Sequence, residues 1–448
     1  MKIIDSVAAV FCHEERIFAV RRQSHLSAFP GYESFPGGKI DREDPDRQHP
    51  ARLLRDQDGR HMHALAREIH EELGYDLPAA IATGQVTSVQ PLATALAPTL
   101  VPLRFRLHFY RIDLNTRPVF TADASEIAGS CWQTPQQLLN SFHEGEALMV
   151  PALRRVLEEL CRKPQGCDFG DHSPLFDEDN YVPRMEVLSE LCLLPVPSNT
   201  FPPEKRTNAF LLGDHDAPKI LVDPSPESAE VLEKLLRTLS QDTVSALFLT
   251  HHHSDHHEHA PQVARRLNVP VWMSEDTLAR ICRKHGPDYF AGVQVVLKQA
   301  GDSVTRWKGE AVLVHAVPGH DAGQLALAPE SLRWFIVGDL IQSVGTVVIA
   351  APEGDMAAYF QTLEKIIALD PTVIVPSHGL PMRGTLRLQA TLRHRREREQ
   401  AIQKLHAAGK TPAEMLDIIY QGLDQKLRPF ARKSIDAHLT KLRQEGLL

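Results

Sequence analysis

The chain has 448 residues, of which 43% are hydrophobic and 24% are charged, and its net charge is −8. This length predicts several separate hydrophobic cores, and no apolar run approaches the roughly 20 residues needed to cross a bilayer. The six cysteines form no CxxC pair, which argues against a disulfide framework and a cysteine zinc site. We therefore expect a multidomain, cytoplasmic protein of mixed α/β and α+β class that does not bind membranes.

The N-terminal part is predicted to be a mixed α/β domain. Residues 17–22 and 103–112 form short strand-like runs, and residues 64–73 have helical spacing. Acidic residues interrupt the first stretch of the chain, where a secretory signal would need an apolar core, so we expect a strand there. The polar, turn-rich stretch 162–184 predicts the boundary to the next folded unit.

Three carboxylates are expected on one face of the helix near residues 64–73. Glu68, Glu71 and Glu72 stand at positions i, i+3 and i+4, so they share a helix face. Clustered carboxylates suit Mg²⁺ or Mn²⁺, which can hold a diphosphate and polarise an attacking water. A glycine loop that includes Gly37 and Gly38 precedes this helix. A charged surface helix with a glycine cap would show a similar pattern.

Residues 67–75 (REIHEELGY) match the R-E-U-x-E-E-x-G-U half of the Nudix motif, and the N-terminal part resembles the Nudix family. The resemblance implies an α/β/α sandwich over residues 1–165 that hydrolyses a nucleoside-diphosphate or coenzyme A-type diphosphate. It also implies an Mg²⁺ or Mn²⁺ ion on the glutamates, catalysis by Glu71, and substrate contact at Gly37 and Gly38. Asp44 stands where the family has Glu, and residues 45–66 replace a much shorter segment. A non-catalytic ligand sensor therefore stays an alternative.

The middle part alternates short β-rich runs, at 246–250, 311–314, 334–337 and 372–375, with helical segments such as 227–239. Just after the first run, the sequence fits H-x-H-x-D-H in one register only, with His251, His253, Asp255 and His256 as matches and His252 as the residue between them. Imidazoles two apart on an extended turn can face one metal ion, while the adjacent carboxylate and histidine face a second. A histidine-rich loop without metal is the alternative.

Three later turns each present one more candidate ligand: His320, Asp339 and His378. Taken in chain order, these seven residues resemble the metal-binding motifs of the metallo-β-lactamase superfamily. The resemblance implies an αβ/βα sandwich, here over residues 180–384, with two zinc or other divalent ions. One ion is implied on His251, His253 and His320 and the other on Asp255, His256 and His378, with Asp339 bridging.

This ligand set implies a hydrolase in which a metal-bridging hydroxide attacks an ester, thioester or phosphodiester, with Asp255 orienting the water or taking its proton. Residues 207–213 and 338–348 look like the β-lactamase-like protein 2 branch, and glyoxalase II-type thioesterases share the ligands. The expected partners are small-molecule substrates, and the oligomeric state is left open. A single-strand RNA endonuclease is a further, less favoured alternative, because the net charge is negative.

The last part, residues 385–448, is predicted to be a small winged-helix-like domain. Thr411-Pro412-Ala413-Glu414 has the pattern of an N-cap, a first-turn proline and a capping box. Met415, Ile418 and Ile419 are expected to form the apolar face of the first helix. In the second helix, the apolar positions 435, 439 and 442 leave Arg432, Lys433, Lys441 and Arg443 on a polar face. These four side chains would contact RNA if the protein were a single-strand RNA endonuclease.

Overall fold

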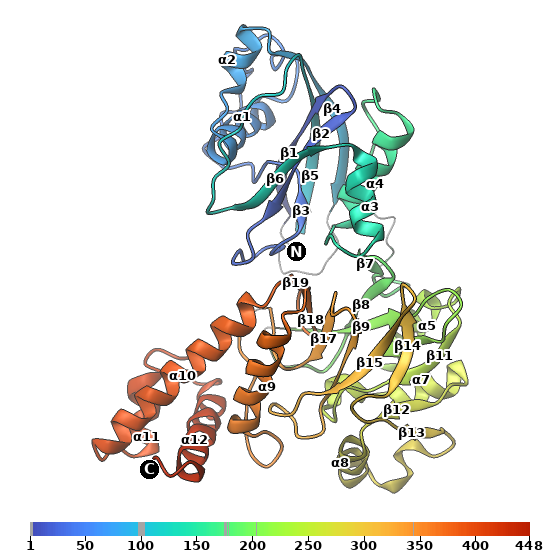
Figure 1. Ribbon diagram of the computed structural model, residues 1–448, viewed down its shortest axis with the longest axis vertical. Coiled ribbons are helices and arrows are strands. Elements are labelled where there is room, and N and C mark those ends of the chain that lie inside the picture. The colour runs from blue at the N-terminus through green and yellow to red at the C-terminus, as the bar shows by residue number, and fades with distance from the viewer. Residues whose placement is uncertain (1–2, 97–103, 174–176, 178, 203, 344) are drawn as a thin grey trace. The chain divides into compact units, whose positions relative to one another are not determined.

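The computed structural model describes residues 3–96, 104–173, 177, 179–202, 204–343 and 345–448 (Figure 1). The chain divides into two compact units. Unit 1 comprises Met1–Glu178 and Met185–Ser189, and unit 2 comprises Asp179–Arg184 and Glu190–Leu448. None of the described helices combines the length and apolar character that crossing a membrane requires.

Unit 1 is a mixed sheet with helices on both faces (Figure 1). Its strands follow the order β3-β2-β1-β5-β4, with β6 paired to β2. They are β1 (Ile3–His13), β2 (Arg16–Arg22), β3 (Glu33–Ser34), β4 (Val86–Leu96), β5 (Arg104–Leu114) and β6 (Ile127–Gln133), and β7 (Met185–Leu188) completes the unit. The helices are α1 (Gly59–Leu73), α2 (Leu77–Ala82), α3 (Pro135–His143) and α4 (Pro151–Arg162). The strand expected at 103–112 is β5, although residue 103 lies outside the described residues.

The period-two alternation of β1 places its side chains in two cores. Val7 and Phe11 pack with the side of α1, while Val10 packs with the side of α3 and α4. A strand buried on both faces is what an α/β/α sandwich requires, so the predicted fold class of this unit is confirmed. Helix α1 begins earlier than expected: Asp58 caps it by accepting a hydrogen bond from the backbone N–H of His61 at 3.1 Å. Residues 59–66 therefore belong to the helix, and the additional segment before it is 45–58.

Unit 2 contains two sheets, each covered by helices on its outer face. The first sheet has the order β13-β12-β11-β10-β9-β8 and the second the order β14-β15-β16-β17-β18-β19. The strands of the first sheet are β8 (Leu191–Pro197), β9 (Arg206–Leu212), β10 (Lys219–Val222), β11 (Val244–Phe248), β12 (Val271–Met273) and β13 (Val295–Leu297). Those of the second are β14 (Ser303–Trp307), β15 (Glu310–Ala316), β16 (Leu325–Pro329), β17 (Phe335–Gly338), β18 (Val373–Pro376) and β19 (Met382–Arg383).

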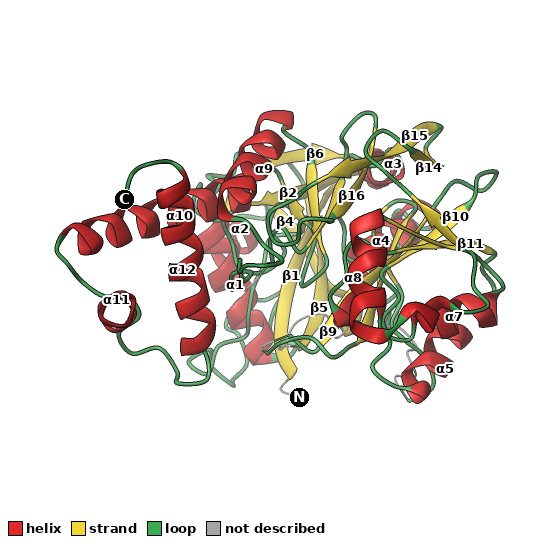
Figure 2. Cartoon of the chain, turned by 90° about the horizontal axis from the view of Figure 1, so that it is seen from below, coloured by secondary structure: helices red, strands yellow, loops and turns green. Residues whose placement is uncertain are grey.

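The helices of unit 2 form two layers. The first layer packs with the first sheet and consists of α5 (Ala229–Thr238), α7 (Ala260–Leu267), α8 (Glu275–His285) and the 3₁₀ turn η1 (Pro287–Phe290). The short helix α6 (Ser254–His257) follows β11 and precedes α7. Helices α9 (Met356–Leu369) and α10 (Leu386–Ala407) pack with the second sheet. Figure 2 shows α9 and α10 on one side of the strands and α5 and α7 on the other. This layering confirms the predicted αβ/βα sandwich, and the predicted strands at 246–250, 311–314, 334–337 and 372–375 correspond to β11, β15, β17 and β18.

The C-terminal helices α11 (Pro412–Ile419) and α12 (Arg428–Gln444) pack with α10 around Ile402, Met415 and Ile435. The predicted capping box at Thr411 is present. Ile418, however, is 52% exposed, so the expectation that it joins the apolar face is wrong. The predicted domain boundaries at 165, 180 and 385 stay predictions.

Lys441 was expected on the polar face of α12, and the structure corrects this. Only 7% of the residue is exposed, and its Nζ donates hydrogen bonds to Glu399 on α10 and to Glu445, both at 2.8 Å. The other carboxylate oxygen of Glu399 accepts from Nδ1 of the fully buried His438 at 3.0 Å. Lys441 therefore attaches α12 to α10 and does not present charge to solvent.

Replacing Glu399 tests this attachment. In Glu399→Ala, His438 loses its acceptor and Lys441 keeps only Glu445. Removing one partner of a buried charge pair costs about 3–5 kcal/mol. We expect the lower end, because the side chain of Glu399 is 14% exposed and Lys441 keeps its contact with Glu445. Hydrogen exchange of the α12 backbone amides should then accelerate by roughly a hundred-fold.

The control is Glu397→Ala, which removes an exposed carboxylate from the same helix. It should change the exchange rates by less than about threefold, as expected for a surface substitution. Unchanged exchange in Glu399→Ala would contradict the attachment.

Candidate metal centre

The loop after β11 carries four of the seven predicted ligands. Strand β11 lies between the parallel strands β10 and β12, so this loop leaves the carboxyl end of a central strand, where layered α/β folds present chemical groups. His251 and His253 lie on the loop itself, and the short helix α6 carries Asp255 and His256. The other three candidates follow strands of the second sheet: His320 comes after β15, Asp339 after β17 and His378 after β18.

His251, His253 and His320 form the first group of converging ring nitrogens. Nδ1 of His253 lies 3.1 Å from Nε2 of His251 and 3.0 Å from Nε2 of His320. On the far side of its ring, Nδ1 of His320 donates to the carbonyl oxygen of Val348 at 2.9 Å. Because a carbonyl can only accept, this contact puts the proton of the neutral ring on Nδ1 and leaves the Nε2 lone pair facing the group.

Asp255, His256 and His378 form the second group, and Asp339 lies between the two. Nε2 of His378 is 3.5 Å from Oδ2 of Asp255 and 3.3 Å from Oδ1 of Asp339. Nε2 of His256 lies 3.5 Å from the same Oδ1. The other oxygen of Asp339, Oδ2, lies 3.9 Å from Nε2 of His320 in the first group.

The donor atoms of this centre fit divalent cations. Nε2 of His256, Nε2 of His378 and Oδ1 of Asp339 are buried and have no hydrogen-bond partner, which is uncommon for buried polar atoms. Within the described part of the chain, the ligand atoms of His251, His253 and His320, of His251, His256 and Asp339, and of Asp255, His256 and His378 each lie within 4.8 Å of one another. Imidazole nitrogens and carboxylate oxygens are the ligand set that zinc prefers outside cysteine sites.

Burial and neighbouring charges shift the pKa values of these groups. Burial lowers the pKa of His320 to about 4, and burial together with the neighbouring His256 lowers the pKa of His251 well below its usual value. Burial alone would raise the pKa of Asp339, but His378 and His256 outweigh it and hold that pKa well below its usual range. Burial alone would lower the pKa values of His256 and His378, but the carboxylates of Asp339 and Asp255 outweigh it and raise the pKa of His256 well above its usual value and that of His378 to about 10. At neutral pH the first group therefore offers neutral imidazoles beside an ionised Asp339, whereas a cation on the second group would displace the protons of its two histidines.

Asp223 supports the ligand loop, a role that sequence reasoning missed. It is fully buried at the end of β10, where Oδ1 accepts from the backbone N–H of Thr250 at 2.8 Å. Its Oδ2 accepts from the hydroxyl of Thr250 at 2.6 Å and from Nδ1 of His256 at 2.8 Å. Thr250 Oγ1 in turn lies 3.0 Å from Nδ1 of His251. The one signal in the sequence is an aspartate directly after the apolar run of residues 220–222.

Gly319 allows the turn that carries His320 to approach helix α9. Its φ is +144°, and a Cβ there would lie 2.4 Å from Cα of Tyr359. A side chain at this position would therefore push the turn away from the helix, because the obstructing atom belongs to the backbone. His252, expected to be only the residue between two ligands, lies beside Asp321 and Glu353.

In unit 1 the structure brings Glu68 and Glu72 to the glycine loop. The backbone N–H of Gly37 donates to Oε2 of Glu72 at 2.8 Å, and a Cβ on Gly38 would lie 2.4 Å from the carboxylate of Glu68. Burial raises the pKa of Glu72 to about 8, against the hydrogen bond from Gly37. The loop itself is attached to β1 by a hydrogen bond from the backbone N–H of Val7 to the carbonyl of Gly38 at 2.9 Å.

Glu71 is the most exposed of the three glutamates. Its side chain is 57% exposed and pairs with Arg67 at 3.1 Å, and Arg67 also binds Glu68 and Asp44. Among the residues that the structure describes, every converging group of three candidate ligands lies in unit 2. The three Nudix-type glutamates therefore form no such group in the described residues, although Glu68 and Glu72 both lie against the glycine loop.

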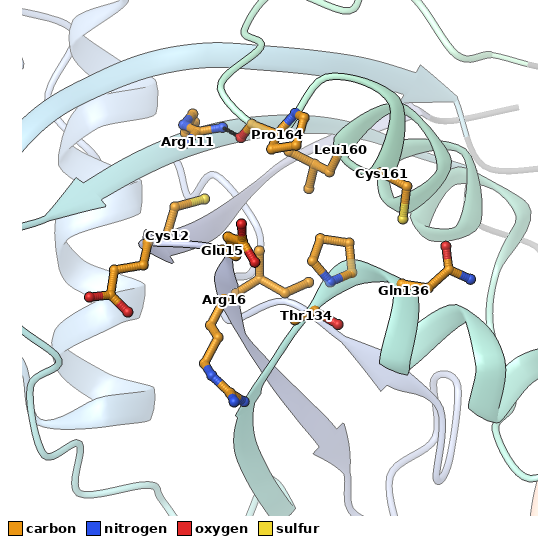
Figure 3. A pocket seen from close by; sticks show the side chains of 12 residues that line it. Cys12, Glu15, Arg16, Arg111, Thr134, Gln136, Leu160, Cys161 and Pro164 are labelled. Atoms are coloured by element: carbon orange, nitrogen blue, oxygen red, sulfur yellow. Dashed lines mark hydrogen bonds between the residues drawn. The ribbon is translucent and has the colours of Figure 1, made fainter.

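A separate cavity of about 370 Å³ lies in unit 1 (Figure 3). Its lining includes Cys12, Glu15, Arg16 and Cys161, and Arg111 is held at its wall by a hydrogen bond to the carbonyl of Pro164 at 2.6 Å. No predicted site residue lines it.

Three sequence-family models match the chain. Residues 2–160 match the NUDIX domain, residues 202–378 the metallo-beta-lactamase superfamily, and residues 411–448 the beta-lactamase associated winged helix domain. The Beta-lactamase-like protein 2 homolog of Drosophila melanogaster is 28% identical over 255 residues, which cover 54% of this chain and 84% of the relative. The atrochrysone carboxyl ACP thioesterase AgnL7 of Paecilomyces divaricatus is 26% identical over 254 residues, 54% of this chain and 75% of the relative.

Among solved structures, a beta-lactamase domain protein from Burkholderia ambifaria has a TM-score of 0.51 and 23% identity, covering 61% of this chain and 91% of that one. At this identity the likeness shows the fold alone. The chain thus joins a Nudix domain, a metallo-beta-lactamase superfamily domain and a beta-lactamase associated winged helix domain, and it is a metal-dependent hydrolase.

Proposed function

We propose that the centre in unit 2 binds two divalent cations and hydrolyses an ester or thioester, with a phosphodiester as the less favoured substrate class. In this proposal His251, His253 and His320 hold one cation, and Asp255, His256 and His378 hold the other. The observation that carries it is the position of Asp339, whose two carboxylate oxygens face different groups. Its unpartnered Oδ1 and the unpartnered nitrogens of His256 and His378 support a cation between them.

The residues of the centre have different roles in this proposal. Two cations bound here would lower the pKa of a water between them and polarise the substrate oxygen. Asp255, with its carboxylate 3.5 Å from Nε2 of His378, orients this water or accepts its proton. Asp223 and Thr250 keep the rings of His251 and His256 in one orientation, which preserves the near-attack geometry on which rate depends.

Thioester substrates are favoured over phosphodiesters by two observations. One relative is named a thioesterase and covers half of this chain. The tail offers less positive charge than expected, since Lys441 is buried against Glu399 and Arg432 pairs with Asp436 at 3.1 Å. A single-strand RNA endonuclease would need that charge to hold the phosphate backbone.

For unit 1 we propose a Nudix diphosphatase that uses Mg²⁺ or Mn²⁺ on Glu68, Glu71 and Glu72, with a nucleoside-diphosphate or coenzyme A-type substrate. The contact between Gly37 and Glu72 supports it, because it brings the glycine loop and the carboxylate helix together. A ligand-sensing domain without turnover is the second candidate. The observation that favours it is the engagement of Glu71 by Arg67, whose Nη1 also donates to Glu68 and so occupies the acceptor oxygens of two of the three carboxylates.

Asp339→Ala tests the centre in unit 2. The substitution takes a donor from both proposed cations, and metal ions supply several kcal/mol of transition-state stabilisation, so kcat/KM for acyl-CoA thioesters should fall by more than about a hundred-fold. Asp216→Ala is the control, because its carboxylate is 75% exposed and pairs with Arg306 on the surface. The proposal fails if Asp339→Ala keeps two bound cations and full turnover.

Glu72→Gln tests unit 1. The variant loses the buried carboxylate that binds the glycine loop. The rate of Mg²⁺-dependent cleavage of coenzyme A or nucleoside diphosphates should therefore fall by at least about a hundred-fold, while thioester hydrolysis stays unchanged. Glu158→Gln serves as control, since Glu158 lies on α4, on the opposite face of the sheet, and pairs with Arg154. Substrate binding by the wild type without any turnover would support the sensor instead.

A further inference from the structure

His252 connects two carboxylates beside the first group of the metal centre. Its ring is buried, and its Nδ1 is ion-paired with the fully buried carboxylate of Asp321. Its Nε2 lies 3.4 Å from Oε1 of Glu353. The second oxygen of Glu353, Oε2, lies 3.3 Å from Nε2 of His253. A continuous polar chain therefore runs from Asp321 through His252 and Glu353 to a proposed metal ligand.

The backbone around Glu353 is attached to the turn that carries His320. The backbone N–H of Ala322 donates to the carbonyl of Glu353 at 3.0 Å, and the N–H of Asp355 donates to the carbonyl of Gly319 at 2.8 Å. A Cβ on Gly354 would lie 2.9 Å from the carbonyl oxygen of His320. Glu353 thus contacts one ligand turn through its backbone and the other through its side chain.

We propose that Glu353 is a positioning residue for His253, and that His252 and Asp321 hold its carboxylate in place. His253 faces the first group with Nδ1, which is the nitrogen near His251 and His320. A neutral imidazole carries its proton on one nitrogen only. The carboxylate beside Nε2 accepts that proton's hydrogen bond, so the lone pair of Nδ1 stays directed into the group. This inference rests on the proposed two-metal centre.

The proposed effect of Glu353 on ligand orientation concerns only the first group of ligands. The ring of His256 is held by Asp223, and Nδ1 of His378 donates to the carbonyl of Arg206 at 3.0 Å. Neither contact involves Glu353. Removing the Glu353 carboxylate should therefore disturb the cation on the first group and leave the other.

The same side chains allow a rival arrangement. Ligand atoms of His252, His253 and Glu353 lie within 4.8 Å of one another and could bind a third cation. That cation would take Nε2 of His253 while Nδ1 serves the first group, which requires a ring without any proton. The positioning role needs only a neutral ring, so we favour it.

The test is a chelator competition with Zn²⁺ on the full-length chain, comparing wild type, Glu353→Ala, Glu353→Gln and Glu364→Ala. Glu364 is the matched control, because its side chain is 47% exposed, as that of Glu353 is, and it pairs with Arg396. We expect the wild type to bind two equivalents. In Glu353→Ala one of the two steps should weaken by about 10–100-fold, while Glu364→Ala matches the wild type.

Glu353→Gln keeps the size of the side chain and an acceptor oxygen, so it should bind with intermediate affinity and fold even if the alanine variant does not. The thioesterase kcat should fall more than KM changes, because a misplaced ligand affects the reacting geometry more than substrate binding. Unchanged binding, equal weakening of both steps, or a third equivalent that Glu353→Ala abolishes would overturn the inference while two cations remain. Absence of any bound pair in the wild type would overturn the proposed function, and this inference with it.

Discussion

The buried carboxylate of Asp223 fixes the loop on which the metal centre depends. Three hydrogen bonds, from the N–H and hydroxyl of Thr250 and from the ring of His256, tie the residues after β11 to the end of the neighbouring strand β10. Each of these donors would be a costly unpaired group without the carboxylate, because the site is buried. The contact therefore sets the position of the loop and the proton positions on two of its histidines together.

The two sheets of unit 2 each contribute some of the ligands of the centre, so the two sheets must keep a fixed position relative to each other. Asn208 on β9 does this: its backbone N–H donates to the carbonyl of Ser377 at 2.8 Å, and its side-chain amide donates to the carbonyls of Pro376 and Gly379. His378 lies between these acceptors in sequence. The first sheet thus holds the ligand turn of the second, which lets Asp339 lie between both groups of side chains.

The ligands themselves could be predicted from sequence because metal chemistry restricts residue types. One aspartate in a run of histidines fixes the frame of His251, His253 and His256, and each later turn offers one histidine or aspartate after an apolar strand. Their supports could not be predicted in the same way. Val348 and Arg206 act through backbone carbonyls, which any residue carries, and Glu353 reaches His253 across 100 positions of the chain.

For the helices, too, the sequence pattern predicted some features and missed others. The periodicity of α12 predicted its apolar stripe correctly, but it could not reveal that Lys441 faces Glu399, since the partner lies on another helix. In unit 1 the N-terminal strand β1 was predicted, while the start of α1 was predicted too late. Gly59 and the histidines after it have weak helix propensity, and the Asp58 cap together with packing overrides it.

The most direct test of the two-cation centre is anomalous X-ray diffraction from crystals of the full-length chain grown with Zn²⁺, measured on both sides of the zinc absorption edge. The account predicts two zinc peaks in unit 2, one at the nitrogens of His251, His253 and His320 and one at Asp255, His256 and His378, with Asp339 contacting both. A single zinc peak, or two peaks of which neither contacts Asp339, would contradict it.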